Sequence, residues 1–242
     1  VPPGFVVEPG FDLAAVDDET LNGWVEAIGG FPVAVRSSGA LEDLDDASFA
    51  GMYATYLDVY QVDSLRRRIV DCRLSVRDER VRRYLERQDA NPSDASVAVL
   101  VQRLIEARVA GVGFSIDPMT GIDEHALLEW CAGLGERLVS GRVAPSRAVI
   151  RLADGTVAEQ VTGHDGVTLG AEQVAELADL LLRVQALRHR PQDIEWAIDG
   201  DGKLWLLQSR AITAINWRTD VGQLTDADFR DGGVSARVCT PL

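Results

Sequence analysis

The stretch DIEWAIDGDGKLWLLQSRAIT, late in the chain, has the pattern of two strands joined by a GDGK turn. If residues 200–203 form a four-residue turn, Glu195 pairs with Gln208 and Asp193 pairs with Arg210. Side chains alternate along a strand, so these four residues are expected on one face of the hairpin. The expected apolar face carries Ile194, Trp196, Ile198, Trp205 and Leu207.

The polar face of this hairpin has the composition of a magnesium and phosphate site. Mg²⁺ takes one or two carboxylates together with substrate phosphates, and an amide oxygen suits the same hard cation. An arginine beside the cation neutralises a phosphoryl group during transfer. The alternative is an amphipathic surface hairpin whose cross-strand ion pair contributes little to stability. Spacing alone favours that alternative.

A second pattern begins at Arg36-Ser37-Ser38 and runs through Glu42-Asp43 to Ser48-Phe49-Ala50-Gly51. A strand ends in a guanidinium with five donors, and a loop of small residues follows. Backbone N–H groups and an arginine in such a place hold phosphate oxygens. A surface loop between two strands collects the same residue types, and spacing alone favours that interpretation.

Net charge excludes some classes of partner. The 242 residues carry a formal charge of −14, which argues against a general nucleic-acid-binding protein. The charge does not argue against a nucleotide, because a site needs only local arginines and a metal ion. Residues 64–88 hold nine arginines against four acids and are interpreted as a solvated helix face. The alternative is a surface that docks an acidic partner domain.

Cysteine and histidine usage indicates a cytoplasmic protein without a metal cluster. Cys72, Cys131 and Cys239 are widely spaced and form no CxxC pair. The N-terminus lacks the features of a signal peptide, and no apolar run approaches the ~18 residues of a membrane span. No motif surrounds His125, His164 or His189, which are interpreted as structural or exposed. Neither the P-loop nor the Rossmann glycine pattern is present.

The order of elements predicts an α+β fold of one large or two small domains. Hairpins and helices are mixed, without a strict strand–helix alternation. We expect helices over residues 17–28 and 171–190, one or two helices over 64–88, and strands around 33–36 and 53–57, over 95–105 and 108–116, and in the terminal hairpin.

Six segments resemble, in order, one family: the nucleotide-binding domain of phosphoenolpyruvate synthase, pyruvate phosphate dikinase and rifampin phosphotransferase. They are VPPGFVV, VAVRSSGALEDLDDASFAGMYATYLDV, VLVQRLI, AGVGFSIDPMTG, GLGERLVSGRVAP and RPQDIEWAIDGDGKLWLLQSRAIT. The resemblance implies an ATP-grasp fold, in which two subdomains with antiparallel sheets clamp ATP. It implies a nucleotide-binding domain over residues 1–213, with a subdomain boundary near 90–110.

The resemblance also assigns site residues in the first half of the chain. The phosphate-binding arginine after the first strand falls on Arg36, to which we also assign a catalytic role. The glycine and threonine of the phosphate loop fall on Gly51 and Thr55. A glutamine on the strand that lines the adenine pocket falls on Gln102.

In the terminal hairpin, the metal and phosphate ligands of the family fall on Glu195 and Gln208. Asp193 is a secondary candidate ligand of the metal, and Arg210 is the second phosphate-binding and catalytic arginine. These are the residues that the strand pairing places on one face. The implied cofactors are therefore ATP and Mg²⁺.

The sequence departs from the family at several positions. Ser115 stands where the family has threonine, and Ala211 stands where it has proline. Gly39, Leu41 and Asp45 also replace commoner residues in the arginine loop, and Met52 lies at the expected nucleotide pocket. The phosphate lysine of the family lies in a GGK segment before VPPGF, and Lys203 is the only lysine here. Because the chain starts at Val1 and ends at TPL, we expect a piece of a longer enzyme.

The activity implied is that of an ATP-dependent phosphotransferase. Related domains pass a phosphoryl group from ATP to a histidine of a swivelling domain, leaving AMP and phosphate. That histidine then phosphorylates pyruvate, a rifamycin or another small acceptor. Residues 214–242 are expected to begin the linker to those missing domains. Two alternatives stay open: a nucleotide-binding module without catalysis, and the activating domain of a related condensing ligase.

Overall fold

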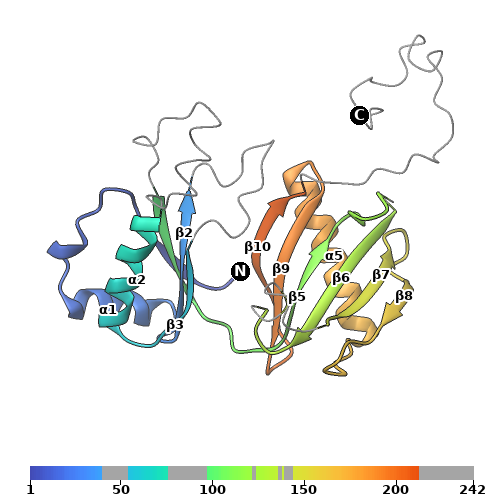
Figure 1. Ribbon diagram of the computed structural model, residues 1–242, viewed down its shortest axis with the longest axis horizontal. Coiled ribbons are helices and arrows are strands. Elements are labelled where there is room, and N and C mark those ends of the chain that lie inside the picture. The colour runs from blue at the N-terminus through green and yellow to red at the C-terminus, as the bar shows by residue number, and fades with distance from the viewer. Residues whose placement is uncertain (40–53, 76–96, 122–123, 136–137, 139–143, 213–242) are drawn as a thin grey trace, which may run out of the picture. The chain divides into compact units, whose positions relative to one another are not determined.

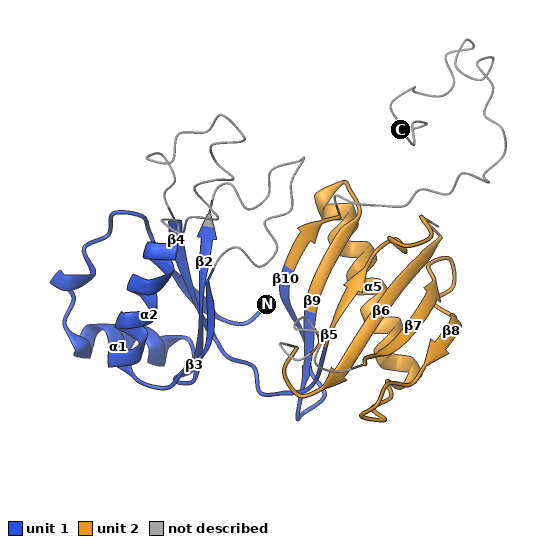
Figure 2. Cartoon of the chain, viewed as in Figure 1, with its two compact units in different colours: residues 1–110, 196–208 blue, residues 111–195, 209–242 orange. Residues whose placement is uncertain are grey.

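The computed structural model describes the chain except for residues 40–53, 76–96, 122–123, 136–137, 139–143 and 213–242 (Figure 1). Gly51, the second half of the arginine-rich segment and the expected linker therefore lie outside the described residues. Two compact units divide the chain, the first comprising residues 1–110 and 196–208 and the second residues 111–195 and 209–242 (Figure 2).

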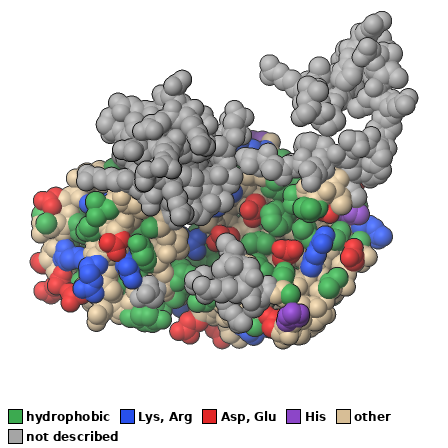
Figure 3. All heavy atoms as spheres, viewed as in Figure 1, with side chains coloured by type: hydrophobic (Ala, Val, Ile, Leu, Met, Phe, Trp, Pro, Cys, Tyr) green, Lys and Arg blue, Asp and Glu red, His purple; other side chains and the backbone are tan. Residues whose placement is uncertain are grey.

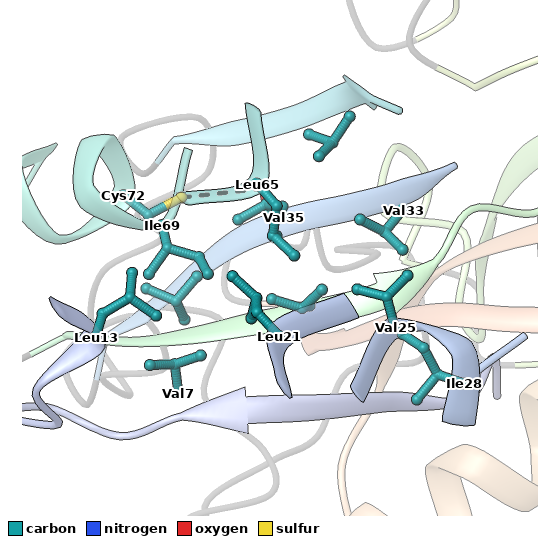
Figure 4. Packing of buried hydrophobic residues seen from close by; sticks show 13 residues of the cluster. Val7, Leu13, Leu21, Val25, Ile28, Val33, Val35, Leu65, Ile69 and Cys72 are labelled. Carbon is teal, nitrogen blue, oxygen red and sulfur yellow. Dashed lines mark hydrogen bonds between the residues drawn. The ribbon is translucent and has the colours of Figure 1, made fainter. Parts of the chain in front are cut away.

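Unit 1 contains a four-stranded sheet in the order β1-β4-β2-β3, in which each neighbouring pair is antiparallel. Valines at alternate positions of β2 and β4 point into a core against two helices, and Figure 4 shows this packing around Val33, Val35, Leu65 and Ile69. The elements are β1 (Gly4–Val7), η1 (Leu13–Ala15), α1 (Asp18–Ala27), β2 (Val33–Gly39), β3 (Thr55–Val59), α2 (Val62–Ser75) and β4 (Val97–Arg103).

Helix α1 agrees with its sequence signals. The carboxylate of Asp17 accepts a hydrogen bond from the backbone N of Thr20 at 2.7 Å and caps the helix. Asp18 and Glu19 lie in the first turn, where the helix dipole favours acids. Leu21 and Val25, one helical turn apart, are buried.

Two arginines of α2 bind the backbone of the preceding N-terminal segment. Arg66 donates to the carbonyl of Leu13 at 2.8 Å and to the carboxylate of Asp18 at 2.7 Å. Arg73 donates to the carbonyls of Phe11 and Glu8, each at 2.9 Å. The expectation of a simply solvated face is therefore wrong for these two side chains, because loop carbonyls within reach replace water as acceptors.

The second sheet has six strands in the order β10-β9-β5-β6-β7-β8. Helix α5 packs closely on it at Gly113: a Cβ there would lie 3.0 Å from Leu128, 3.3 Å from Ile194 and 3.4 Å from Leu181 of the helix. The elements are β5 (Ala107–Phe114), β6 (His125–Ala132), β7 (Ser146–Arg151), β8 (Val157–Val161), α5 (Ala171–Arg188), β9 (Gln192–Asp199) and β10 (Leu204–Ala211).

The predicted α+β class and the antiparallel sheets expected of an ATP-grasp fold are confirmed. Strands β1, β6, β7 and β8 are not among the strands expected above. Strand β8 is exposed along its whole length, so no apolar alternation signals it. Within the described residues, no helix combines the length and apolar composition needed to cross a membrane. On the face shown in Figure 3, acidic and basic side chains are interspersed with apolar ones.

Candidate functional site

The loop of the β9–β10 hairpin is shorter than predicted. The backbone N of Asp199 donates to the carbonyl of Lys203 at 3.1 Å, and the N of Gly202 donates to the carbonyl of Asp199 at 3.1 Å. Asp199 and Lys203 are thus paired, and three residues lie between them instead of four. Gly202 has φ +86°, which only glycine adopts easily, and its position is that of the bulge glycine in three-residue hairpin loops.

The open end of the hairpin keeps the predicted register. The backbone N of Ile212 donates to the carbonyl of Pro191 at 3.1 Å. If the strands keep this register from the open end toward the loop, Asp193 pairs with Arg210. The pairing of Glu195 with Gln208 stays a prediction. The two ends of the hairpin differ in register by one residue, so one strand contains a bulge.

The three-residue loop changes which face carries the apolar residues of β10 that lie near it. Ile194, Trp196 and Ile198 are buried, as predicted. Trp205 and Leu207 were expected beside them but pack instead with Ala197, in a cluster that also contains Ile105 and Ala110. Because side chains alternate, Ala197 lies on the opposite face from Trp196. The prediction for Trp205 and Leu207 is wrong, since the one-residue slip at the loop reverses the face of the side chains that lie between the loop and the bulge.

Glu195 and Arg210 both act electrostatically on Asp193. Burial and the neighbouring carboxylate of Glu195 raise the pKa of Asp193 from 3.8 to about 6, while Arg210 lowers it. Two carboxylates held together in a partly buried place favour a proton or a cation between them.

Arg36 is the central residue of β2 and is directly paired with Thr55 of β3. Its Nη1 donates to the Oε1 of Gln208 at 3.2 Å. The structure therefore brings together three predicted site residues that are far apart in the sequence. The amide oxygen of Gln208 keeps a second lone pair for another partner.

Gln102 has a structural partner. It is buried on β4, and its Nε2 donates to the carbonyl of Pro2 at 3.1 Å. Strand β1 also passes close by, because Gly4 is paired with Gln102 and a Cβ on Gly4 would lie 2.8 Å from its Cγ. Gln102 thus fixes the N-terminal segment, and its role toward adenine stays a prediction.

The donor set of the hairpin fits Mg²⁺. Asp193 and Glu195 supply two clustered carboxylates, and Gln208 supplies an amide oxygen. The described residues contain no group of three or more His, Cys, Asp and Glu side chains able to hold a metal ion. Mg²⁺ needs no such group, since it retains waters and shares its coordination with substrate phosphates.

Sequence reasoning overlooked a buried polar residue next to this site. Gln192 occupies the buried face of β9 together with Ile194, Trp196 and Ile198, and only 2% of it is exposed. A glutamine at an apolar position of a strand is a usable signal, because a buried amide must find hydrogen-bond partners. Its partners are Ser115 and Ser209.

The raised pKa of Asp193 predicts a pH-dependent stability. The native carboxyl binds its proton more tightly than the unfolded chain does, so native stability falls as pH rises from about 4 to about 6. We expect the free energy of unfolding of Asp193→Asn to rise relative to that of wild type between about pH 4 and pH 6. Above about pH 6 the difference between the two proteins is expected to stay constant. Urea unfolding at a series of pH values without divalent cations measures this; a difference that is flat between pH 4 and 6 contradicts it.

Two comparisons with known proteins, a family model and the sequence relatives, agree on one family. The model of the "Pyruvate phosphate dikinase, AMP/ATP-binding domain" matches residues 18–170 and 150–228. The chain is 32% identical over 249 residues to a probable phosphoenolpyruvate synthase of Methanothermobacter thermautotrophicus, covering 93% of the chain and 36% of that protein. It is 36% identical over 203 residues to a rifampicin phosphotransferase of a Streptomyces species, covering 75% of the chain and 23% of that protein.

Two further similar proteins carry names that refer to other activities. The prodigiosin synthesizing transferase PigC of Serratia marcescens is 36% identical over 207 residues, covering 76% of the chain and 23% of that protein. Among solved structures, the D-cycloserine synthetase DcsG has a TM-score of 0.40 at 12% identity, covering 88% of this chain and 58% of that one. The chain spans between 23% and 36% of the length of the three sequence relatives named here.

Proposed function

Because the chain belongs to the pyruvate phosphate dikinase AMP/ATP-binding domain family, we propose that it is the nucleotide-binding part of a dikinase-type phosphotransferase. The parent protein cleaves ATP to AMP and phosphate and passes a phosphoryl group to a histidine of a separate swivelling domain. That histidine then phosphorylates a small acceptor. The observation that carries the proposal is the match to this family, and the hydrogen bond from Arg36 to Gln208, which joins two residues of the expected site, supports it.

In this function the two arginines bind phosphate oxygens. The planar guanidinium groups of Arg36 and Arg210 present several donors each, which suits the oxygens of a polyphosphate. Thr55, paired with Arg36, adds a hydroxyl donor. Gln208 accepts from Arg36 and so orients one guanidinium before nucleotide arrives.

Glu195 and Gln208, with Asp193 as a further ligand, would hold Mg²⁺. When bound, this cation supplies positive charge that stabilises the transferring phosphoryl group. The protein contribution is positioning: the hairpin holds the acids and Arg210 at one place on a rigid sheet. The domain extends over residues 1–213 in this proposal, and residues 214–242 begin the linker to the histidine and acceptor domains.

The parent enzyme is proposed to be cytoplasmic. Cys72 and Cys131 are buried and form no disulfide within the described residues, which suits a reducing compartment. Burial raises the pKa of Cys72 to about 12, so this thiol is unreactive.

Calorimetry of this chain with ATP and Mg²⁺ tests nucleotide binding, and an AMP-release assay on the full-length protein tests cleavage. We expect magnesium-dependent ATP binding by the chain and AMP formation by the full-length protein. Binding without AMP formation by the full-length protein overturns the phosphotransferase in favour of a binding module. Absence of ATP binding contradicts both.

A second candidate is activation of a substrate for condensation, and the likeness to the prodigiosin synthesizing transferase supports it. The two functions share the ATP site proposed here and differ in the acceptor. Product analysis of the full-length protein separates them, since a condensing enzyme joins two organic substrates and releases phosphate, whereas a phosphotransferase leaves a phosphorylated acceptor.

A further inference from the structure

A network of hydrogen-bonded polar side chains, buried or half-buried, lies directly behind the proposed metal-binding face of the second sheet. Ser115 follows β5 and is 1% exposed, and Gln192 opens β9 and is 2% exposed. Gln185 of α5 and Ser209 of β10 are half-buried. Polar groups in such an apolar environment are stable only when their hydrogen bonds are made. The network is therefore expected to be rigid.

The hydroxyl of Ser115 joins three elements. Its Oγ accepts from the backbone N of Gln192 at 2.7 Å and donates to the Oε1 of Gln185 at 2.5 Å. The backbone N of Ser115 donates to the carbonyl of Gln192 at 2.9 Å. The end of β5, helix α5 and the start of β9 are thus tied together at a single residue.

The side chain of Gln192 continues these bonds across the hairpin. Its Oε1 accepts from the Oγ of Ser209 at 2.7 Å, and its Nε2 donates to the carbonyl of Pro191 at 3.0 Å. The carbonyl of Pro191 also accepts a hydrogen bond from the backbone N of Ile212, and this bond sets the register at the open end of the hairpin. Gln192 therefore links β9 to β10 through a side chain as well as through the sheet.

Each end of this link is next to a proposed site residue. Gln192 precedes Asp193, and Ser209 precedes Arg210. Because side chains alternate across a strand, the linked residues lie on the face opposite to Asp193 and Arg210. The linked residues therefore do not face the proposed site. They can act on Asp193 and Arg210 only by fixing the backbone from which these two side chains project.

We propose that Ser115, Gln192 and Ser209 are positioning residues that hold Asp193 and Arg210 at the separation needed for magnesium and phosphate. The inference rests on the proposed function of the hairpin and adds residues to it. Groups behind a metal-binding set orient the ligands, and their loss commonly costs about 10- to 100-fold in metal affinity or activity.

The chain offers a matched control in another buried serine of the same unit. Ser146 is fully buried, and its Oγ accepts from the backbone N of Gly163 at 2.9 Å and donates to the carbonyl of Val167 at 2.8 Å. Ser115→Ala and Ser146→Ala each delete one buried hydroxyl with two partners. A merely structural role for Ser115 predicts the same consequences for both variants.

The functional measurement is calorimetric binding of ATP with Mg²⁺ to the chain and its variants. We expect Ser115→Ala to weaken binding about 10- to 100-fold, while Ser146→Ala stays within about threefold of wild type. Ser115→Thr keeps the hydroxyl and is expected to restore binding. If Ser115→Ala does not fold, Ser209→Ala, which removes one bond at the half-buried end of the link, replaces it. Equal effects of the Ser115 and Ser146 variants overturn the proposal.

Amide hydrogen exchange provides a readout that does not depend on nucleotide. We expect Ser115→Ala and Ser209→Ala to raise exchange around Asp193 and Ile212, and Ser146→Ala to raise it around Gly163 only. Unchanged exchange at the hairpin in the first two variants overturns the positioning role. Failure of the wild-type chain to bind ATP, with the exchange pattern as expected, contradicts the proposed function while leaving the backbone role of the network in place.

Discussion

Replacing Glu195 by glutamine is expected to abolish ATP cleavage by the full-length protein, with a loss of at least about 100-fold, and to leave the fold intact. Glutamine has nearly the same volume and keeps one carbonyl oxygen, so packing on β9 is preserved. It removes the charge that balances a divalent cation and leaves Asp193, a partly buried side chain, as the single carboxylate of the pair. Measurement of AMP release against ATP and Mg²⁺ concentration gives the result directly.

The control for this variant is Glu159→Gln on β8. Glu159 is exposed at the opposite edge of the same sheet, so the substitution removes one negative charge without touching the hairpin. It is expected to retain wild-type turnover. Undiminished AMP release in Glu195→Gln, or an equal loss in both variants, contradicts the role assigned to Glu195.

Replacing Arg36 by lysine is the second change with a large expected effect, a fall in ATP turnover of about 100- to 1000-fold. Lysine keeps the positive charge but loses the planar fork, so one side chain no longer donates to Gln208 and to phosphate oxygens in fixed directions at the same time. The loss is expected mainly in the rate of ATP cleavage, because the charge that attracts nucleotide remains. Rapid-quench measurement of AMP formation at saturating ATP separates this rate from binding.

Arg103→Lys is the matched control for Arg36→Lys. Arg103 is exposed at the end of β4, in the same four-stranded sheet, and the exchange of arginine for lysine is identical. Wild-type turnover is expected. If Arg36→Lys also turns over ATP normally, the guanidinium of Arg36 does not act on the phosphates, and the assignment fails.

Much of the local structure could be predicted because its signals are local. The cap at Asp17 and the apolar stripe of α1 define that helix within a few residues. Helix α5, expected over residues 171–190, is found at Ala171–Arg188. Strand β8 could not be predicted in the same way, since a fully exposed strand has no buried side to generate alternation.

The candidate site was predictable in part for the same reason. Asp193 and Glu195 are two residues apart on a strand, so they share a face whatever the rest of the chain does. The register of β10 was not predictable from spacing, because a loop of three residues and a bulge replace the expected four-residue turn. That difference moved Trp205 and Leu207 to the other face while leaving Arg210 beside Asp193.

The sequence by itself determined the α+β class, the main helices and strands, and the pair of acids on one face of β9, since all of these follow from residue types and periods within short segments. Only the tertiary structure decided that Arg36 meets Gln208, that Arg66 and Arg73 bind loop carbonyls, and that Ser115 and Gln192 share a buried bond. These contacts join residues 53 to 172 positions apart. Local periodicity carries no information about such pairs, because burial and register are set by which distant segments pack together.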